Sequence, residues 1–146
     1  MLWQGQEFAD NYVLPVSGDL RIHFRRNVHW EYFYDDAGAP LVRLYRILGK
    51  LRHSCPALRS RESFYYNTGS RPADGVAAYR RQSTAARQIA MVFLNFSDKQ
   101  QTVTVPFPEP GLYQERIDNK ISIAAAEAGQ PLAIDVPSNY GCVFVK

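Results

Sequence analysis

The stretch that decides the fold is residues 88–107, which read QIAMVFLNFSDKQQTVTVPF. Ile89–Leu94 is apolar throughout, as in a strand that is buried on both faces. Val103 and Val105 instead alternate with threonines, as in a strand with one face in solvent. Ser97-Asp98 between them has the composition of a turn. The stretch therefore predicts two antiparallel strands, with Ile89–Leu94 near the centre of a sheet.

The period of two extends in both directions from this stretch, from residue 62 to the end of the chain. Segments rich in Gly, Pro, Asn and Asp separate the candidate strands, as turns do. Eight short strands at this spacing predict an antiparallel β-sandwich, and the fold class is mainly β. The predicted strands are Ser63–Asn67, Val76–Gln82, Gln88–Phe96, Gln101–Phe107, Leu112–Asp118, Lys120–Ala124, Leu132–Val136 and Gly141–Val145.

One α-helix is predicted before the strands, over residues 40–54. Its leucines and Tyr45 recur at the spacing of three and four that places apolar side chains on one helix face. Pro40 suits a first helical turn, and Pro56 moves Cys55 out of the helical region and ends the helix.

Residues 1–36 are predicted to be extended and irregular, and aromatic side chains crowd them. Eight of the 19 aromatic residues lie in this segment: Trp3, Phe8, Tyr12, Phe24, Trp30, Tyr32, Phe33 and Tyr34. A loop of over 30 residues is unusual in a compact domain, and such loops tend to be functional.

Length and charge set broad limits. A chain of 146 residues corresponds to about one domain. The net charge of +3 comes from scattered basic residues, with Arg25-Arg26 and Arg80-Arg81 only as doublets. We therefore expect no nucleic-acid partner. No apolar run reaches the roughly 20 residues that span a bilayer, so we expect no membrane partner. The N-terminus lacks a charged n-region and an apolar h-region, so we expect no signal peptide.

Candidate catalytic groups are few. Glycoside hydrolysis needs two carboxylates on opposite sides of a sugar bond, whereas Asp35 and Asp36 are adjacent and suit a polar loop or helix cap. Glu7 and Asp10 are the other close acids. His23 and His29 have no common metal-site spacing, and we expect no metal, no cofactor and no catalytic residue in this chain.

Cys55 and Cys142 are two unpaired cysteines, which is too few for a disulfide framework or a zinc site. We expect reduced, partly buried thiols. They favour a cytoplasmic location, although the compartment stays open.

The N-terminal segments resemble the α-amylase family, glycoside hydrolase family 13. Met1–Phe8, MLWQGQEF, resembles the eighth barrel strand of that family and its Gly-x-Glu-aromatic turn. Val28–Tyr32 resembles the Trp-containing segment before the last barrel helix. Leu41–Arg59, with its Pro-Ala-Leu exit, resembles that helix. The predicted strands then match the antiparallel C-terminal domain of the family in architecture.

The resemblance implies a C-terminal piece of a larger enzyme. Residues 1–56 would be a remnant of the catalytic barrel, and residues 57–146 the C-terminal β-sandwich. The catalytic carboxylates of the family would lie upstream of Met1, so the chain alone is expected to be a non-catalytic accessory domain. Its candidates for substrate-proximal residues in the intact enzyme are Trp3, Gly5, Glu7, Phe8 and Trp30.

Three functions stay open from the sequence. The first is an accessory domain that stabilises the barrel of an enzyme acting on starch, glycogen or maltooligosaccharides. The alternative is a carbohydrate-binding module that stacks α-glucan on exposed aromatics, with five tyrosines to consider: Tyr65, Tyr66, Tyr79, Tyr113 and Tyr140. The third, a separate sandwich enzyme, lacks a pair of acids or a His–acid couple.

Residues 1–36 would lose their barrel partners in a free fragment. We therefore expect this segment to pack on the sandwich or to form a homodimer.

Overall fold

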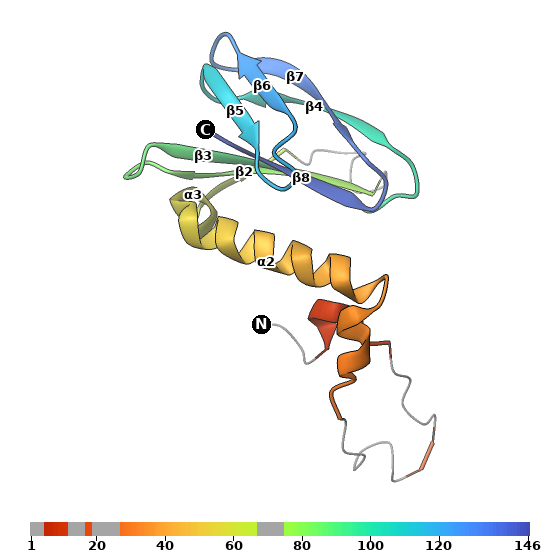
Figure 1. Ribbon diagram of the computed structural model, residues 1–146. Coiled ribbons are helices and arrows are strands. Elements are labelled where there is room, and N and C mark those ends of the chain that lie inside the picture. Colours follow the sequence, from red (N-terminus) through yellow and green to blue (C-terminus); the bar gives the residue numbers. More distant parts are fainter. Residues whose placement is uncertain (1–4, 12–16, 19–26, 67–74) are drawn as a thin grey trace. The chain divides into compact units, whose positions relative to one another are not determined.

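The computed structural model in Figure 1 describes residues 5–11, 17–18, 27–66 and 75–146. The chain divides into two compact units, residues 1–49 and residues 50–146. The predicted division into a barrel remnant, residues 1–56, and a sandwich, residues 57–146, stays a prediction.

The described residues of the second unit form eight strands in two antiparallel sheets (Figure 1). The larger sheet has six strands in the order β1-β2-β3-β8-β5-β6, and the smaller one pairs β4 with β7. Their bounds are β1 Glu62–Tyr65, β2 Val76–Ser83, β3 Gln88–Asn95, β4 Gln101–Phe107, β5 Gly111–Glu115, β6 Ser122–Ala125, β7 Gln130–Val136 and β8 Tyr140–Val145. The predicted antiparallel sandwich is confirmed, and the apolar β3 lies inside its sheet.

Strand ends account for most of the differences from prediction. The strand predicted to reach Asp118 ends at Glu115, because the chain there turns around the Glu115 carboxylate. The next strand begins at Ser122 rather than Lys120. The predicted end of the first strand, Asn67, lies outside the described residues.

The core of this unit lies between the two sheets. Phe93 of β3 and Phe107 of β4 stack with ring centroids 6.5 Å apart, and Tyr113 of β5 meets Phe107 edge-on at 4.8 Å. All three side chains are fully buried. Along β4 the inward residues Val103, Val105 and Phe107 alternate with exposed ones, as predicted. Large rings from both sheets thus fill the interior.

Two helices precede the strands, α2 (Gly38–Ser54) and α3 (Pro56–Arg59). The Asp35 carboxylate accepts hydrogen bonds from the backbone N–H of Ala37 at 3.0 Å and of Gly38 at 2.5 Å, which confirms the predicted capping role. Cys55 has extended backbone angles between the two helices, as the proline after it requires.

The described part of residues 1–36 is not extended throughout. Two short 3-10 helices, Gln6–Phe8 and Trp30–Tyr34, lie there. The close approach of this segment to α2 requires a glycine, since a Cβ on Gly38 would lie 1.7 Å from the carbonyl oxygen of Tyr32. The expectation of an irregular extended leader was therefore wrong for these two turns.

Candidate functional site

Three of the predicted substrate-proximal residues lie in one turn. Gly5 has a φ of +86°, and its carbonyl accepts hydrogen bonds from the backbone N–H of Phe8 at 3.3 Å and of Asp10 at 3.0 Å. A Cβ on Gly5 would lie 2.7 Å from the Cβ of Asp10, so the turn requires glycine for both space and conformation. Glu7 is half-buried in this turn. Trp3 lies outside the described residues.

The structure brings two of these candidates together in an aromatic cluster of Phe8, Trp30 and Phe33. The ring centroid of Phe8 lies 5.9 Å from that of Trp30 and 6.5 Å from that of Phe33. Phe8 is 1% exposed, whereas Trp30 is 62% exposed. Phe8 therefore anchors the cluster, and Trp30 presents a large apolar surface to solvent.

The sequence did not predict the pair of Asp10 and His29. The ring Nδ1 of His29 lies 3.2 Å from Oδ2 and 3.4 Å from Oδ1 of Asp10, and both side chains are partly buried. A protonated Nδ1 donates to the carboxylate, which ties the turn after Gly5 to the residues before Trp30. Their separation of 19 positions matches no motif spacing, so this His–acid couple could be found only in the folded chain.

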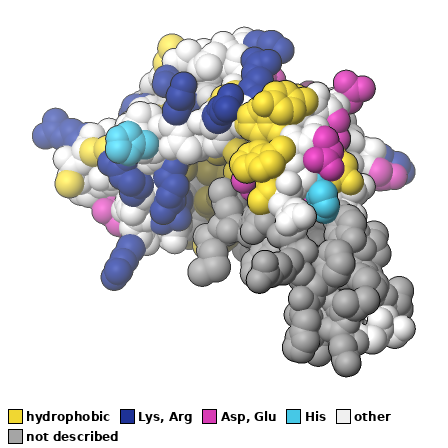
Figure 2. All heavy atoms as spheres, turned by 60° about the horizontal axis from the view of Figure 1, so that its bottom comes forward, with side chains coloured by type: hydrophobic (Ala, Val, Ile, Leu, Met, Phe, Trp, Pro, Cys, Tyr) yellow, Lys and Arg dark blue, Asp and Glu magenta, His cyan; other side chains and the backbone are white. Residues whose placement is uncertain are grey.

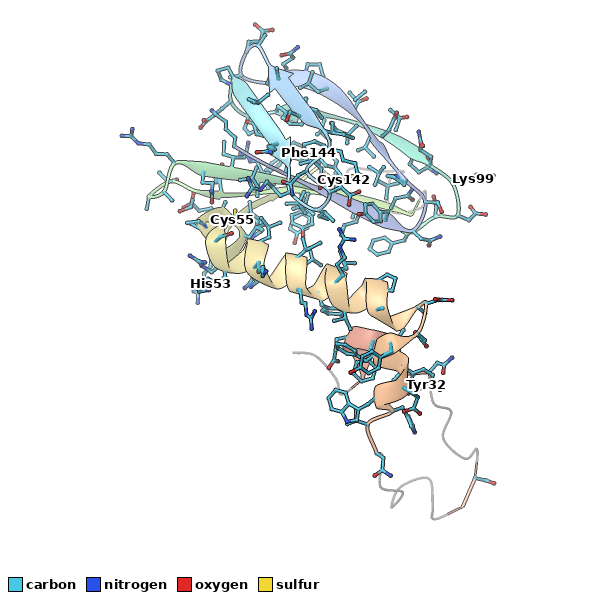
Figure 3. The ribbon with its side chains drawn as sticks, in the orientation of Figure 1. Tyr32, His53, Cys55, Lys99, Cys142 and Phe144 are labelled. Carbon is cyan, nitrogen blue, oxygen red and sulfur yellow. The ribbon has the colours of Figure 1, made fainter. Side chains whose placement is uncertain are left out.

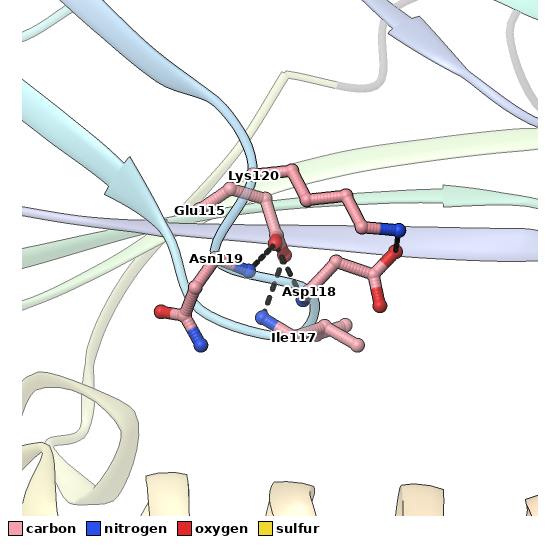
Figure 4. A network of polar contacts seen from close by, with 5 residues as sticks. All are labelled: Glu115, Ile117, Asp118, Asn119 and Lys120. Atoms are coloured by element: carbon pink, nitrogen blue, oxygen red, sulfur yellow. Dashed lines mark hydrogen bonds and ion pairs between the residues drawn. The ribbon is translucent and has the colours of Figure 1, made fainter.

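The buried acid of the second unit is Glu115, which is 4% exposed (Figure 4). Its Oε2 accepts hydrogen bonds from the backbone N–H of Asp118 at 2.7 Å and of Asn119 at 3.0 Å. Its Oε1 accepts from Ile117 at 2.8 Å and from Val143 at 3.5 Å. A carboxylate whose two oxygens are both bonded to backbone donors holds a loop together and is poorly placed to transfer protons.

The two cysteines are free thiols on separate elements, Cys55 between the helices and Cys142 on β8 (Figure 3). The Cys55 thiol donates to Oε1 of Gln88 at 3.0 Å, and the same oxygen accepts from the N–H of Ala57. Burial, followed by the charges of Glu115 and Asp118, raises the pKa of Cys142 to about 11. The Cys142 thiol is therefore protonated and weakly nucleophilic at neutral pH.

The five sandwich tyrosines differ in exposure. Tyr113 is fully buried, and its hydroxyl donates to the carbonyl of Glu109 at 3.0 Å. Tyr66 belongs to the core as well, and burial raises its pKa. Tyr79 and Tyr140 are half-buried, whereas Tyr65 is 61% exposed. Tyr65 is thus the tyrosine of this set most open to a ligand.

The described ranges hold no group of three or more His, Cys, Asp or Glu side chains placed to bind a metal ion. None of the helices in them is both long and apolar enough for a membrane crossing. On the face drawn in Figure 2, Lys and Arg side chains lie in several places, and hydrophobic side chains gather in one patch.

Comparison with known proteins identifies the fold. No family model matches the sequence, and no curated protein matches it. Among solved structures, AmyP in complex with maltose superposes with a TM-score of 0.72 at 15% identity, over 97% of this chain and 30% of AmyP. The Anoxybacillus α-amylase gives a TM-score of 0.61 at 19% identity, over 77% of this chain and 23% of that enzyme.

A third structure agrees, the α-amylase of Geobacillus thermoleovorans complexed with acarbose, with a TM-score of 0.57 at 19% identity over 76% of this chain. The chain spans 23–30% of the length of these three enzymes. The resemblance seen in the sequence is confirmed at the level of structure, and the chain has the fold of the sandwich-containing part of α-amylase family enzymes.

Proposed function

We propose that this chain is the non-catalytic C-terminal accessory part of an enzyme that hydrolyses or transfers α-glucan, and that it stabilises the catalytic barrel of that enzyme. One observation carries the proposal: AmyP, solved in complex with maltose, has a fold that covers 97% of this chain, while this chain covers only 30% of AmyP. A (β/α)8 barrel needs roughly 250 residues, more than this chain has. The catalytic carboxylates would then lie in the remaining part of the enzyme.

The exposed apolar side chains of the first unit support a role at an interface. Trp30 is 62% exposed, Tyr34 is 81% exposed and Leu48 of α2 is 38% exposed. Trp30 and Tyr34 are linked through the rings of Phe8 and Phe33. An exposed group of apolar side chains is a common sign of a surface that other parts of a protein cover. The rest of the barrel, packed against this unit, would gain about 25 cal/mol for each Å² of apolar surface that it buries.

The polar groups of the second unit support a structural role. Glu115 is bonded to backbone N–H groups. Asn95, which is 1% exposed, donates to the carbonyls of Lys99, Val136 and Pro137 and accepts from the N–H of Ser97. Both side chains close loops of the sandwich, which is what a rigid supporting domain requires.

The test uses the longer polypeptide encoded by the reading frame that includes this chain. We compare its melting temperature and its activity on maltoheptaose with those of a version that ends before residue 62. Loss of the sandwich is expected to lower the melting temperature of the barrel by several degrees and to leave any remaining activity chemically unchanged. The 146-residue chain alone is expected to release no reducing sugar from maltoheptaose.

Two results would contradict the proposal. One is hydrolysis of maltoheptaose by the chain alone, after purification to constant specific activity. The other is a barrel whose melting temperature is the same with and without residues 62–146.

A further inference from the structure

The edge strand β1 carries aromatic side chains on both faces of the larger sheet. All four of its residues are exposed, including Phe64 at 51% and Tyr65 at 61%. Successive side chains of a strand point to opposite faces, so these two rings lie on different sides. Phe64 shares its face with Tyr66 of the core, at a ring distance of 5.1 Å. Tyr65 is therefore on the outer face.

Tyr65 is held in place by a cross-strand partner. It stands opposite Tyr79 of β2 in the register, and the two ring centroids lie 5.2 Å apart with planes inclined by 35°. Tyr79 is half-buried, and its pKa is raised by burial and by the nearby Tyr65. A fixed ring loses little conformational freedom when a ligand stacks on its exposed side.

The next residues along the two strands on this face are a hydroxyl and a guanidinium. Ser63 and Arg81 are the next opposed pair on the same face. The Arg81 guanidinium donates to the carbonyl of Ser60, and its Nε is buried. Arg80 points to the other face, where its guanidinium carbon lies 5.1 Å from the centroid of the Phe64 ring. The outer face thus offers a ring, hydroxyl groups and one guanidinium that is bonded to a carbonyl of this chain.

We propose that Tyr65, backed by Tyr79, is a stacking platform for a glucosyl unit of an α-glucan chain, a non-catalytic attachment point on the accessory domain. The substrate class rests on the proposed function. A pyranose ring has a face of C–H bonds, which packs against the electron-rich face of an aromatic ring, and hydroxyl groups at its rim that exchange hydrogen bonds with neutral partners.

A platform of one exposed ring predicts weak binding, with a dissociation constant on the order of millimolar. Titration calorimetry of the full chain with maltoheptaose measures it. Tyr65→Ala and Tyr65→Leu are both expected to weaken binding about tenfold or more, since leucine keeps apolar area without a ring face. Tyr65→Phe is expected to bind within about twofold of the unsubstituted chain, because it keeps the ring.

Phe64→Ala is the matched control, because it removes an exposed ring from the same strand but the opposite face. Phe96→Ala removes a ring that is 70% exposed at the end of β3. Both are expected to leave the affinity for maltoheptaose unchanged. Circular dichroism of every variant establishes that it folds before its affinity is compared.

Three results would overturn the proposal: no heat of binding from the unsubstituted chain at millimolar maltoheptaose, equal losses from Phe64→Ala and Tyr65→Ala, or tighter binding of a single-stranded oligonucleotide than of the glucan. Equal losses of affinity from Phe64→Ala and Tyr65→Ala would mean that glucan contacts both faces of β1 rather than Tyr65 alone. None of them bears on barrel stabilisation, which is read from the melting temperature of the longer polypeptide.

Discussion

Replacing Glu115 by glutamine tests the buried network that shapes the loop after β5. Glu115→Gln keeps the size of the side chain but exchanges one acceptor oxygen for an NH₂ group. Oε1 and Oε2 each accept two backbone N–H bonds, so two donors lose their acceptor whichever way the amide turns. A hydrogen bond to a charged group contributes about 1.5–3 kcal/mol. Asp118 and Asn119 are exposed, so water can bond to their N–H groups and compensate for part of the lost hydrogen-bond energy. We expect a loss of about 2–4 kcal/mol in the free energy of unfolding.

Urea unfolding followed by circular dichroism measures this loss, with equal slopes of free energy against urea as the condition for comparing variants. Glu127→Gln, an identical change at an exposed site, is the control and is expected to stay within about 0.5 kcal/mol of the unsubstituted chain. If Glu115→Gln is as stable as Glu127→Gln, the carboxylate does not organise the loop and the reasoning fails.

Three further predictions follow from the same structure. Asn95→Ala removes a side chain that bonds three carbonyls and Ser97, and it is expected to lower the unfolding free energy by about 2–3 kcal/mol in the same urea assay. The Cys142 thiol keeps its proton to about pH 11 in the folded chain, whereas its ordinary pKa is 9.0, so stability is expected to fall as the pH rises from 9 to 11. Cys142→Ala is expected to lose less stability between pH 9 and 11 than the unsubstituted chain. If the two chains lose the same stability over this range, the thiol is not the cause of the loss. Residues 1–36 are expected to pack on the sandwich or to form a homodimer; light scattering that shows a monomer, together with free exchange of the backbone amides of that segment, would exclude both.

The strands were the most predictable part of this fold. The pattern of apolar residues reflects how many faces of a strand are buried. The structure buries one face of Gln101–Phe107, where apolar residues alternate, and both faces along most of the apolar run Ile89–Leu94, as expected. Strand ends were harder to predict, because they depend on distant partners. Glu115 ends β5 by gathering N–H groups from its own loop and from Val143, and no local pattern reveals that.

In the first unit, periodicity predicted most of α2, and resemblance drew attention to the segments around Gly5 and Trp30. The turn after Gly5 has a positive φ and Phe8 lies against Trp30, and the placement of these residues near substrate stays a prediction. The pair of Asp10 and His29 was missed because folding alone brings the two segments together. Of the five candidate tyrosines, Tyr65 is 61% exposed, whereas its neighbour Tyr66 is buried. Alternation shows that the two side chains point to opposite faces, but only the register to β2 shows which face is the outer one.

The reading frame upstream of Met1 tests the central claim most directly. If the chain is the accessory part of an α-glucan-acting enzyme, sequencing the DNA upstream will show an open frame that encodes seven strand–helix repeats of a barrel. Three catalytic carboxylates are expected at the ends of its fourth, fifth and seventh strands. An in-frame stop codon shortly before Met1, or an upstream region that encodes an unrelated fold, would contradict the account.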